Sequence, residues 1–314
     1  MGLLLFAYIV STADVVGAAG LILGADRVYL AAGLLLVALE VAVRSLCWKA
    51  LAGIYAGGYR YSDALQAYMI GIAFGSVTPG KAGDLVKVTD LRDRMGLDMT
   101  KAFTVGLLDR LINFMFLFIS AGAAAAAVAM TMAGLGDSLL PVIVFMAAFI
   151  PAVFVVLNER VSSALLRPLQ AFLVPERFRG DTKSLFRTFH KTVGEFRRSR
   201  SRSAVAALML LGWLIIFARP YFFGRALGMD VGWWTFMLFI PIVSAVEVLP
   251  LSIMGLGTRD ASILFLFGLM GVDRERMVAL SAMILLLSLL PQVVAGYLIA
   301  WSRKVTLEYE STAR

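Results

Sequence analysis

Six long apolar runs alternate with short polar segments along this chain. They cover residues 3–24, 29–57, 102–133, 138–157, 204–226 and 276–302. A helix needs about 20 mostly apolar residues to cross a bilayer, so each run is long enough. The pattern predicts an all-α, polytopic membrane protein with about six full transmembrane helices and a single membrane domain, 1–314. We expect the long third run to be tilted, or broken near Gly122.

Two further apolar regions, 64–99 and 233–272, are interrupted in the middle. The first contains SVTPGKAGD (Ser76–Asp84), and the second contains MGLGTRD (Met254–Asp260). Proline cannot donate a backbone hydrogen bond, and glycine adopts conformations that end helices. We therefore expect each region to form two half-length helices joined by a turn, as a re-entrant hairpin does.

The two broken regions resemble each other. MGLD (Met95–Asp98) returns as MGVD (Met270–Asp273), and the same offset places Gly80 on Gly255. Three predicted crossings separate the copies, and an odd number makes them face opposite ways. This is the inverted repeat of many secondary transporters. The first repeat is 29–133 with hairpin 64–99, and the second is 204–302 with hairpin 233–272.

Composition and charge agree with a membrane protein. The chain is 60% hydrophobic and 16% charged, whereas soluble domains are about a quarter charged. Segment 158–203 contains eleven of the 29 basic residues, and the positive-inside rule makes it a cytoplasmic linker. Counting crossings from it places both termini in the cytoplasm, in the cell membrane. The net charge of +8 indicates contact with anionic lipid, not with nucleic acid.

The residues that usually carry metal or nucleophilic chemistry are scarce. Cys47 is the only cysteine and His190 the only histidine. A disulfide, a zinc site or a histidine-based triad would need partners that the chain lacks. We therefore expect no metal, no cofactor and no catalytic residues.

The turn of each hairpin has the chemistry of an anion site. If Gly80 and Lys81 begin a half-helix, their amides carry the partial positive charge that binds phosphate or carboxylate. Gly255, Gly257 and Arg259 offer the same arrangement in the second hairpin. The alternative interpretation is two turns at the membrane surface, with Lys81 extending to the headgroups.

Charges inside the predicted spans support an anion pathway. Glu40 and Arg44 are four residues apart on one helix face, so we expect them to pair. Ionisable groups at such depth usually face a cavity. A purely structural Glu40–Arg44 pair remains open, as does a cytoplasmic-interface position for Asp109 and Arg110. The other charges of this kind are Arg219 and Glu247.

The spacing DLRD (Asp90–Asp93) is that of metal-binding motifs in membrane transferases. With Asp84 it could hold a metal in an enzyme acting on a lipid-linked substrate. No second acidic motif follows, so solvated charge on a cytoplasmic half-helix is the better explanation.

The order of these motifs resembles a known family, the lysylphosphatidylglycerol synthase transmembrane domain, over about residues 3–304. It is carried by Arg44 and Trp48, the PGKAGD turn (Pro79–Asp84), and the late Gly-x-Gly-x-Arg-acid turn. Carried over by position, the polar site residues are Arg44, Lys81, Asp84, Lys87, Asp109, Arg110, Arg259 and Asp260. The acidic residue before Arg110 is commonly glutamate in this family, so the shorter Asp109 puts its role in doubt.

The resemblance implies a lipid flippase and not an enzyme. We expect no aminoacyltransferase domain, and so no lysyltransferase activity. The expected ligands are phospholipids, including aminoacylated phosphatidylglycerol, or polyprenyl-phosphate-linked lipids. The alternatives are a membrane-embedded transferase, or a non-catalytic partner of a separately encoded lipid synthase or glycosyltransferase.

Overall fold

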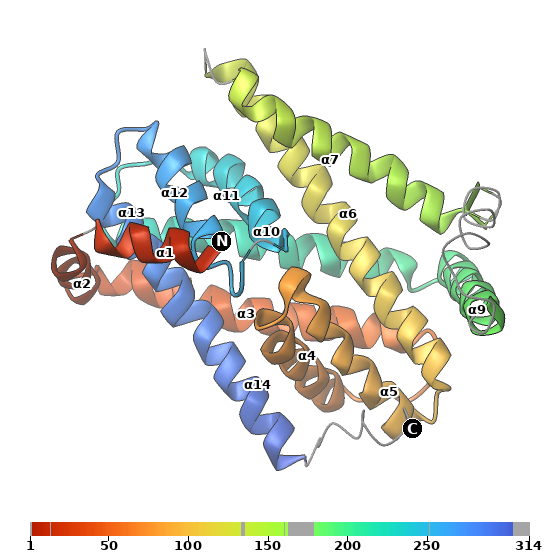
Figure 1. Cartoon of the computed structure of the whole chain (residues 1–314). Helices are drawn as coiled ribbons and strands as arrows, with labels where there is room; N and C mark the ends of the chain where they lie inside the picture. The colour runs from red at the N-terminus through yellow and green to blue at the C-terminus, as the bar shows by residue number, and fades with distance from the viewer. Residues whose placement is uncertain are drawn as a thin grey trace.

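The computed structural model describes residues 2–12, 14–132, 136–159, 161–162, 179–250 and 252–303. Every regular element in these residues is helical (Figure 1), which confirms the all-α prediction. In chain order the elements are α1 (Gly2–Ser11), α2 (Val15–Leu23), α3 (Arg27–Ala52), α4 (Tyr61–Ser76), η1 (Pro79–Lys87), α5 (Val88–Met95), α6 (Met99–Thr131), α7 (Gly136–Leu157), α9 (Arg179–Arg198), α10 (Arg202–Ala226), α11 (Trp233–Val248), α12 (Thr258–Gly268), α13 (Arg274–Met283), η3 (Ile284–Leu289) and α14 (Leu290–Ser302).

Four of the described helical stretches are long and apolar enough to cross a membrane. They are α3, α6, α10 and the continuous stretch Arg274–Ser302, which joins α13, η3 and α14. All four coincide with predicted crossings. The run 138–157 lies in α7, a helix of 22 residues. α6 continues through Gly122 without a break, so the expected interruption there is wrong. The chain is a polytopic helical membrane protein, as predicted.

The first predicted crossing, 3–24, is not one helix. α1 ends at Ser11, and α2 begins at Val15 after Asp14. The Asp14 carboxylate accepts a hydrogen bond from the Gly17 amide at 2.8 Å and so starts a new helix there. Neither α1 nor α2 is long enough to cross a bilayer alone. α1 instead packs against α12, and α2 packs against α13.

The two broken regions interrupt their helices where proline and glycine predicted. α4 ends at Ser76 before η1, in which Gly80 and Lys81 have φ angles of 62° and 56°. Between α11 and α12, Gly255 and Gly257 have φ angles of 72° and 85°. Only glycine enters this left-handed region at no steric cost. That each break re-enters the membrane stays a prediction.

Matched positions of the predicted repeat share their local conformation. Gly96 and Gly271 both have positive φ, at 65° and 73°. Two residues later, Asp98 and Asp273 are the N-caps of α6 and α13, and each side chain accepts a backbone hydrogen bond. In each copy the glycine follows the end of one helix and the aspartate starts the next. The similarity of the two copies therefore extends from sequence to backbone conformation. Its inversion across the membrane stays a prediction.

The helices around the two breaks pack closely (Figure 1). α3 lies against α10 and α4, α14 lies against α4, and α6 contacts α7, α9 and α11. Glycines permit the closest approaches. A Cβ added to Gly296 on α14 would lie 2.2 Å from the Met69 carbonyl of α4. Small residues at such contacts are typical of helix pairs in membranes.

The basic segment 158–203 contains α9, which packs on α6 through the buried side chains of Phe189 and Val193. Its exposed face carries Arg187 and Lys191. Residues 163–178 of the predicted linker lie outside the described residues. The described part is therefore a helix docked on the bundle with its cations outward.

Substituting Gly296 with alanine should destabilise the protein by about 1–3 kcal/mol, because the new methyl group forces α14 away from α4. The free energy of unfolding in detergent measures this. Gly194 in α9 is the matched control, since a Cβ there meets nothing within 4 Å. Gly194→Ala should stabilise the protein by about 0.5–1 kcal/mol through helix propensity. Equal effects at both sites would contradict the close α4–α14 contact.

Candidate functional site

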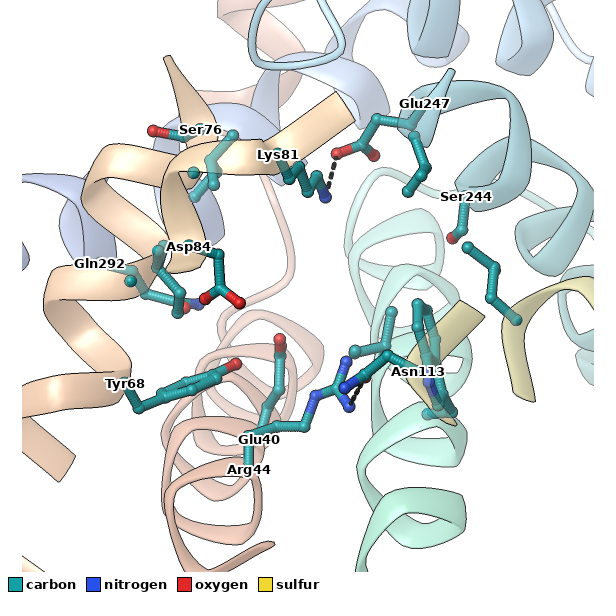
Figure 2. A pocket seen from close by; sticks show the side chains of 18 of the residues that line it. Glu40, Arg44, Tyr68, Ser76, Lys81, Asp84, Asn113, Ser244, Glu247 and Gln292 are labelled. Carbon is teal, nitrogen blue, oxygen red and sulfur yellow. Dashed lines mark hydrogen bonds and ion pairs between the residues drawn. The ribbon is translucent and has the colours of Figure 1, made fainter. Parts of the chain in front are cut away.

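A cavity of about 200 Å³, here called the central cavity, lies among α3, α4, η1, α6, α10 and α11. Figure 2 shows Glu40 and Arg44 of α3 pointing into it, with Asp84 on one side and Ser244 on the other. Of the residues predicted to form the site, those that line this cavity are Glu40, Arg44, Lys81, Asp84, Lys87, Asp109, Arg110, Arg219, Glu247 and Arg259. The structure thus brings together residues from far apart in the chain.

The two helix breaks meet beside this cavity. The Met254 amide donates a hydrogen bond to the Ser76 carbonyl at 3.1 Å. Lys81 Nζ of the first break lies 3.1 Å from Glu247 Oε1 of the second, a contact drawn in Figure 2. These contacts join the two helix breaks, whose turns are called the tips from here on.

The first break places Lys87 between two carboxylates. Lys87 Nζ lies 2.8 Å from Asp84 Oδ2 and 2.6 Å from Asp109 Oδ2. Its side chain is only 4% exposed, and Nζ also lies 4.6 Å from the centre of the Trp48 ring. Arg110 lies 3.4 Å from Asp84 on its other side. Asp109 and Arg110 therefore belong to the cavity, and the shorter aspartate reaches its cation.

Two backbone amides of the first turn are satisfied internally. The Lys81 amide donates to the Thr78 carbonyl at 3.0 Å, and the Gly83 amide donates to Thr78 Oγ1 at 2.7 Å. A Cβ on Gly83 would lie 2.3 Å from the Phe74 carbonyl, so the turn folds tightly onto α4. The expectation that the Lys81 amide is free for an anion is wrong. The side chain, not the amide, faces the cavity.

The second turn is closed in a similar way. Asp260 Oδ2 accepts the Gly257 amide at 2.7 Å, and the Leu256 amide donates to the Ile253 carbonyl at 3.0 Å. These amides are therefore not available to an anion, contrary to the expectation. An acid three residues after the N-cap satisfies the helix start by itself. Gly255 and Gly257 supply the backbone conformation of the turn.

Arg259 belongs to a buried cluster behind the second turn. Its side chain is 2% exposed and lies 3.2 Å from Asp260 Oδ1. Arg259 Nε donates to Ser281 Oγ at 3.2 Å, and Ser281 in turn donates to Asp260. Arg259 thus reaches the cavity wall with its charge already paired.

The expected Glu40–Arg44 pair is replaced by a longer-range one. Glu40 forms its ion pair with Arg219 of α10, and both side chains are buried. α3 and α10 pack side by side, which brings the two residues together across 179 positions of sequence. Spacing within one helix could not show this competing partner.

Arg44 stands apart from the other cavity cations. It donates to Asn113 Oδ1 at 2.6 Å, and its guanidinium lies 4.8 Å from the centre of the Trp213 ring. Each of the other five basic side chains of the central cavity has a carboxylate within ion-pair distance. Among the described residues, Arg44 has none. Glu40 and Asp109 attract it from a longer distance, so within the described part of the chain Arg44 is the lining cation that has no acid of its own.

Sequence reasoning did not identify several polar residues of the cavity. Asn113 follows Asp109 by one helical turn, so its helical spacing was a usable signal. Trp213 and Gln292 lie within predicted spans, and nothing in their local sequence distinguishes them. Several of the lining residues carry a buried donor with no partner among the described residues; these donors include Arg44 Nε, Trp213 Nε1, Arg219 Nε and Ser288 Oγ. The cavity therefore offers several unpartnered donors to a ligand.

A second cavity, of about 370 Å³, lies on the α5 side of the central cavity. Lys87 lines both, so this buried cation stands between them. Asp90 lines the second cavity and pairs with Arg94 at 3.0 Å and with Arg303 of the α14 end at 2.7 Å. The described residues contain no group of acids, histidines or cysteines able to hold a metal. Asp90 and Asp93 serve in ion pairs instead.

Comparison with known proteins gives one match. The family model for the lysylphosphatidylglycerol synthase TM region matches residues 1–296. No curated protein and no solved structure matches the chain. The match spans nearly the whole chain, including both helix breaks and the residues of the central cavity, and its name connects the chain with membrane lipids. The chain therefore belongs to the lysylphosphatidylglycerol synthase transmembrane-region family, as the order of its motifs predicted.

Proposed function

We propose that this protein moves a membrane lipid across the cytoplasmic membrane, with the lipid's phosphate-bearing headgroup passing through the central cavity. The observation that carries this proposal is Arg44, a guanidinium that lines the cavity and has no carboxylate within ion-pair distance among the described residues. A buried charge without an ion-pair partner is costly, and a ligand of opposite charge would lower that cost. The unpartnered donors of the cavity favour an acceptor-rich group such as a phosphate.

The residues of the cavity take different parts in this proposal. Arg44 binds the phosphate, and Lys81, whose side chain is 40% exposed, stays paired with Glu247 between the two helix breaks. Arg259 and Asp260 hold the second turn in shape. The candidate lipids are phospholipids, including an aminoacylated phosphatidylglycerol, and polyprenyl-phosphate-linked lipids, and their tails stay in the bilayer.

The two cavities on either side of Lys87 support a pathway. A headgroup moving between them must pass the ion-paired lysine, so Lys87 with Asp84 and Asp109 forms a closed barrier in this structure. Translocation then requires the barrier and the contact between the tips to open in turn. The protein acts as a carrier and not as an enzyme, and its partners are the lipids themselves or a lipid synthase or glycosyltransferase that supplies them.

Purified protein in vesicles should exchange headgroup-labelled lipid between leaflets, and Arg44→Gln should slow this exchange about ten- to a hundredfold. A hydrogen bond to a charged group contributes about 1.5–3 kcal/mol, and each 1.4 kcal/mol is about tenfold. Arg225→Gln is the control, since Arg225 pairs with Asp230 and does not line the cavity. If wild-type protein exchanges no lipid class, or both variants behave alike, the proposal fails.

Replacing Lys87 with methionine should lower the free energy of unfolding by about 3–5 kcal/mol, because it leaves a buried carboxylate without its cation. The double variant Lys87→Met with Asp109→Asn keeps the Asp84–Arg110 pair and restores the charge balance. It should recover most of the lost stability in the same detergent unfolding measurement. A double variant no more stable than Lys87→Met would contradict the assigned ion pairs.

The proposed orientation places the α3–α4 loop in the cytoplasm and the α10–α11 loop outside. In a Cys47→Ser background, a cysteine at Gly57 should react with impermeant reagent only from the cytoplasmic side. A cysteine at the exposed Asp230 should react only from outside. Labelling of both positions from one side would rule out this orientation.

A further inference from the structure

The charges of the side chains that line the central cavity indicate which class of lipid headgroup it binds. We propose that the cavity selects a headgroup with a single negative charge, a phosphodiester, over a phosphomonoester, a diphosphate or a zwitterion. This rests on the proposed function and narrows its list of lipids. It disfavours an aminoacylated headgroup, which carries its own cation, and a polyprenyl monophosphate or diphosphate. The argument depends on which charges of the cavity are paired and which are not.

Six basic side chains line the central cavity, and five carboxylates pair with them. The pairs join Lys81 with Glu247, Lys87 with Asp84 and Asp109, Arg110 with Asp84, Arg219 with Glu40, and Arg259 with Asp260. With these groups ionised, the balance is one positive charge. That charge is on Arg44, the lining cation without a carboxylate.

The pairs are tight and mostly buried, so a ligand does not exchange them freely. Lys87 is 4% exposed and Arg259 is 2% exposed. Separating either from its acid would leave a buried charge alone, which is strongly unfavourable. A ligand therefore meets the cavity as a site with one available positive charge, not six.

One positive charge is neutralised by one negative charge. A phosphodiester carries a single charge at neutral pH, and its two free oxygens suit a guanidinium. A phosphomonoester carries about 1.5 to 2 negative charges at pH 7 and would leave the cavity negative. A zwitterionic headgroup would bring its own cation towards Arg44. In a partly buried site each mismatch leaves an uncompensated charge.

The surroundings of Arg44 also fit an oxygen-rich diester. Its guanidinium is held between Asn113 and the Trp213 ring, and its Nε is left without a partner. Figure 2 shows Tyr68 on the other side of this group, with its hydroxyl directed into the cavity. Fixed donors around one guanidinium favour a compact anion of defined shape over a diffuse or multiply charged one.

Glu247 sets the number of available charges. It neutralises Lys81, the most exposed cation of the cavity, across the contact between the tips. Glu247→Gln would free Lys81 and raise the available charge from one to two. The inference therefore predicts that this substitution shifts the preference from diesters to monoesters, and that Arg44→Gln removes the preference for anions.

The test measures the affinity of purified protein in detergent for soluble probes with identical dihexanoyl tails. The probes are phosphatidylglycerol as the diester, phosphatidic acid as the monoester, and phosphatidylcholine as the zwitterion. Wild-type protein should bind phosphatidylglycerol at least about tenfold more tightly than either of the others. A short polyprenyl phosphoryl-sugar, also a diester, distinguishes a polyprenyl source from a glycerolipid source of the same chemistry.

The two variants should act in opposite directions. Glu247→Gln should improve binding of phosphatidic acid about tenfold, and Arg44→Gln should bring phosphatidylglycerol down to the level of phosphatidylcholine. Asp230→Asn is the control, because it removes an exposed acid away from the cavity and should change no ratio. Since the variants shift ratios between probes, a general loss of folding would not imitate the result.

Equal or tighter binding of phosphatidic acid by wild-type protein would overturn the inference, as would an unchanged ratio in Glu247→Gln. These outcomes are separate from the failure of the proposed function. Lipid exchange without a charge preference would leave transport standing and remove the selectivity. If the probes bind in the expected order but the protein exchanges no lipid, the selectivity would stand and the transport proposal would fail.

Discussion

A backbone that breaks inside an apolar helical bundle must satisfy its freed polar groups within the protein. Both breaks of this chain do so locally. Thr78 accepts the amides of the first turn, Asp260 accepts that of the second, and Ser76 accepts the Met254 amide between them. Because these amides already have acceptors, the charged side chains are the main groups that the central cavity offers to a ligand. This is why charge counting, and not helix-terminus chemistry, describes the site.

The ion pairs of the cavity connect segments that are far apart in sequence. Lys81 and Glu247 are 166 positions apart, and Glu40 and Arg219 are 179 apart. Such pairs hold the bundle in register, but apolar side chains of the same volume would often stabilise it as well or better. So many charges in so small a volume therefore favour a role in binding over one in stability. Arg44 agrees with this, since no carboxylate among the described residues lies within ion-pair distance of it.

The sequence predicted the helix breaks well because proline and glycine act locally, through φ and the missing amide donor. It also identified most of the cavity's charged residues, since ionisable groups inside apolar runs are conspicuous. It failed where the deciding partner is distant or subtle. The partner of Glu40 depends on how α3 packs on α10, and the division of the run 3–24 depends on a single cap at Asp14. Asn113 is uncharged, so only its spacing of one helical turn from Asp109 could have indicated that it lines the cavity.

The contacts that close the central cavity differ greatly in strength, and this sets the order in which it can open. The tips are joined by one backbone hydrogen bond, of about 0.5–1.5 kcal/mol, and by the Lys81–Glu247 pair, in which the lysine is 40% exposed. Freeing the buried Lys87 from its acids would cost about 3–5 kcal/mol. Thermal motion therefore separates the tips long before it opens the Lys87 barrier. A headgroup phosphate held at Arg44 leaves both contacts intact, so the tip side would open first while the α5 side stays closed.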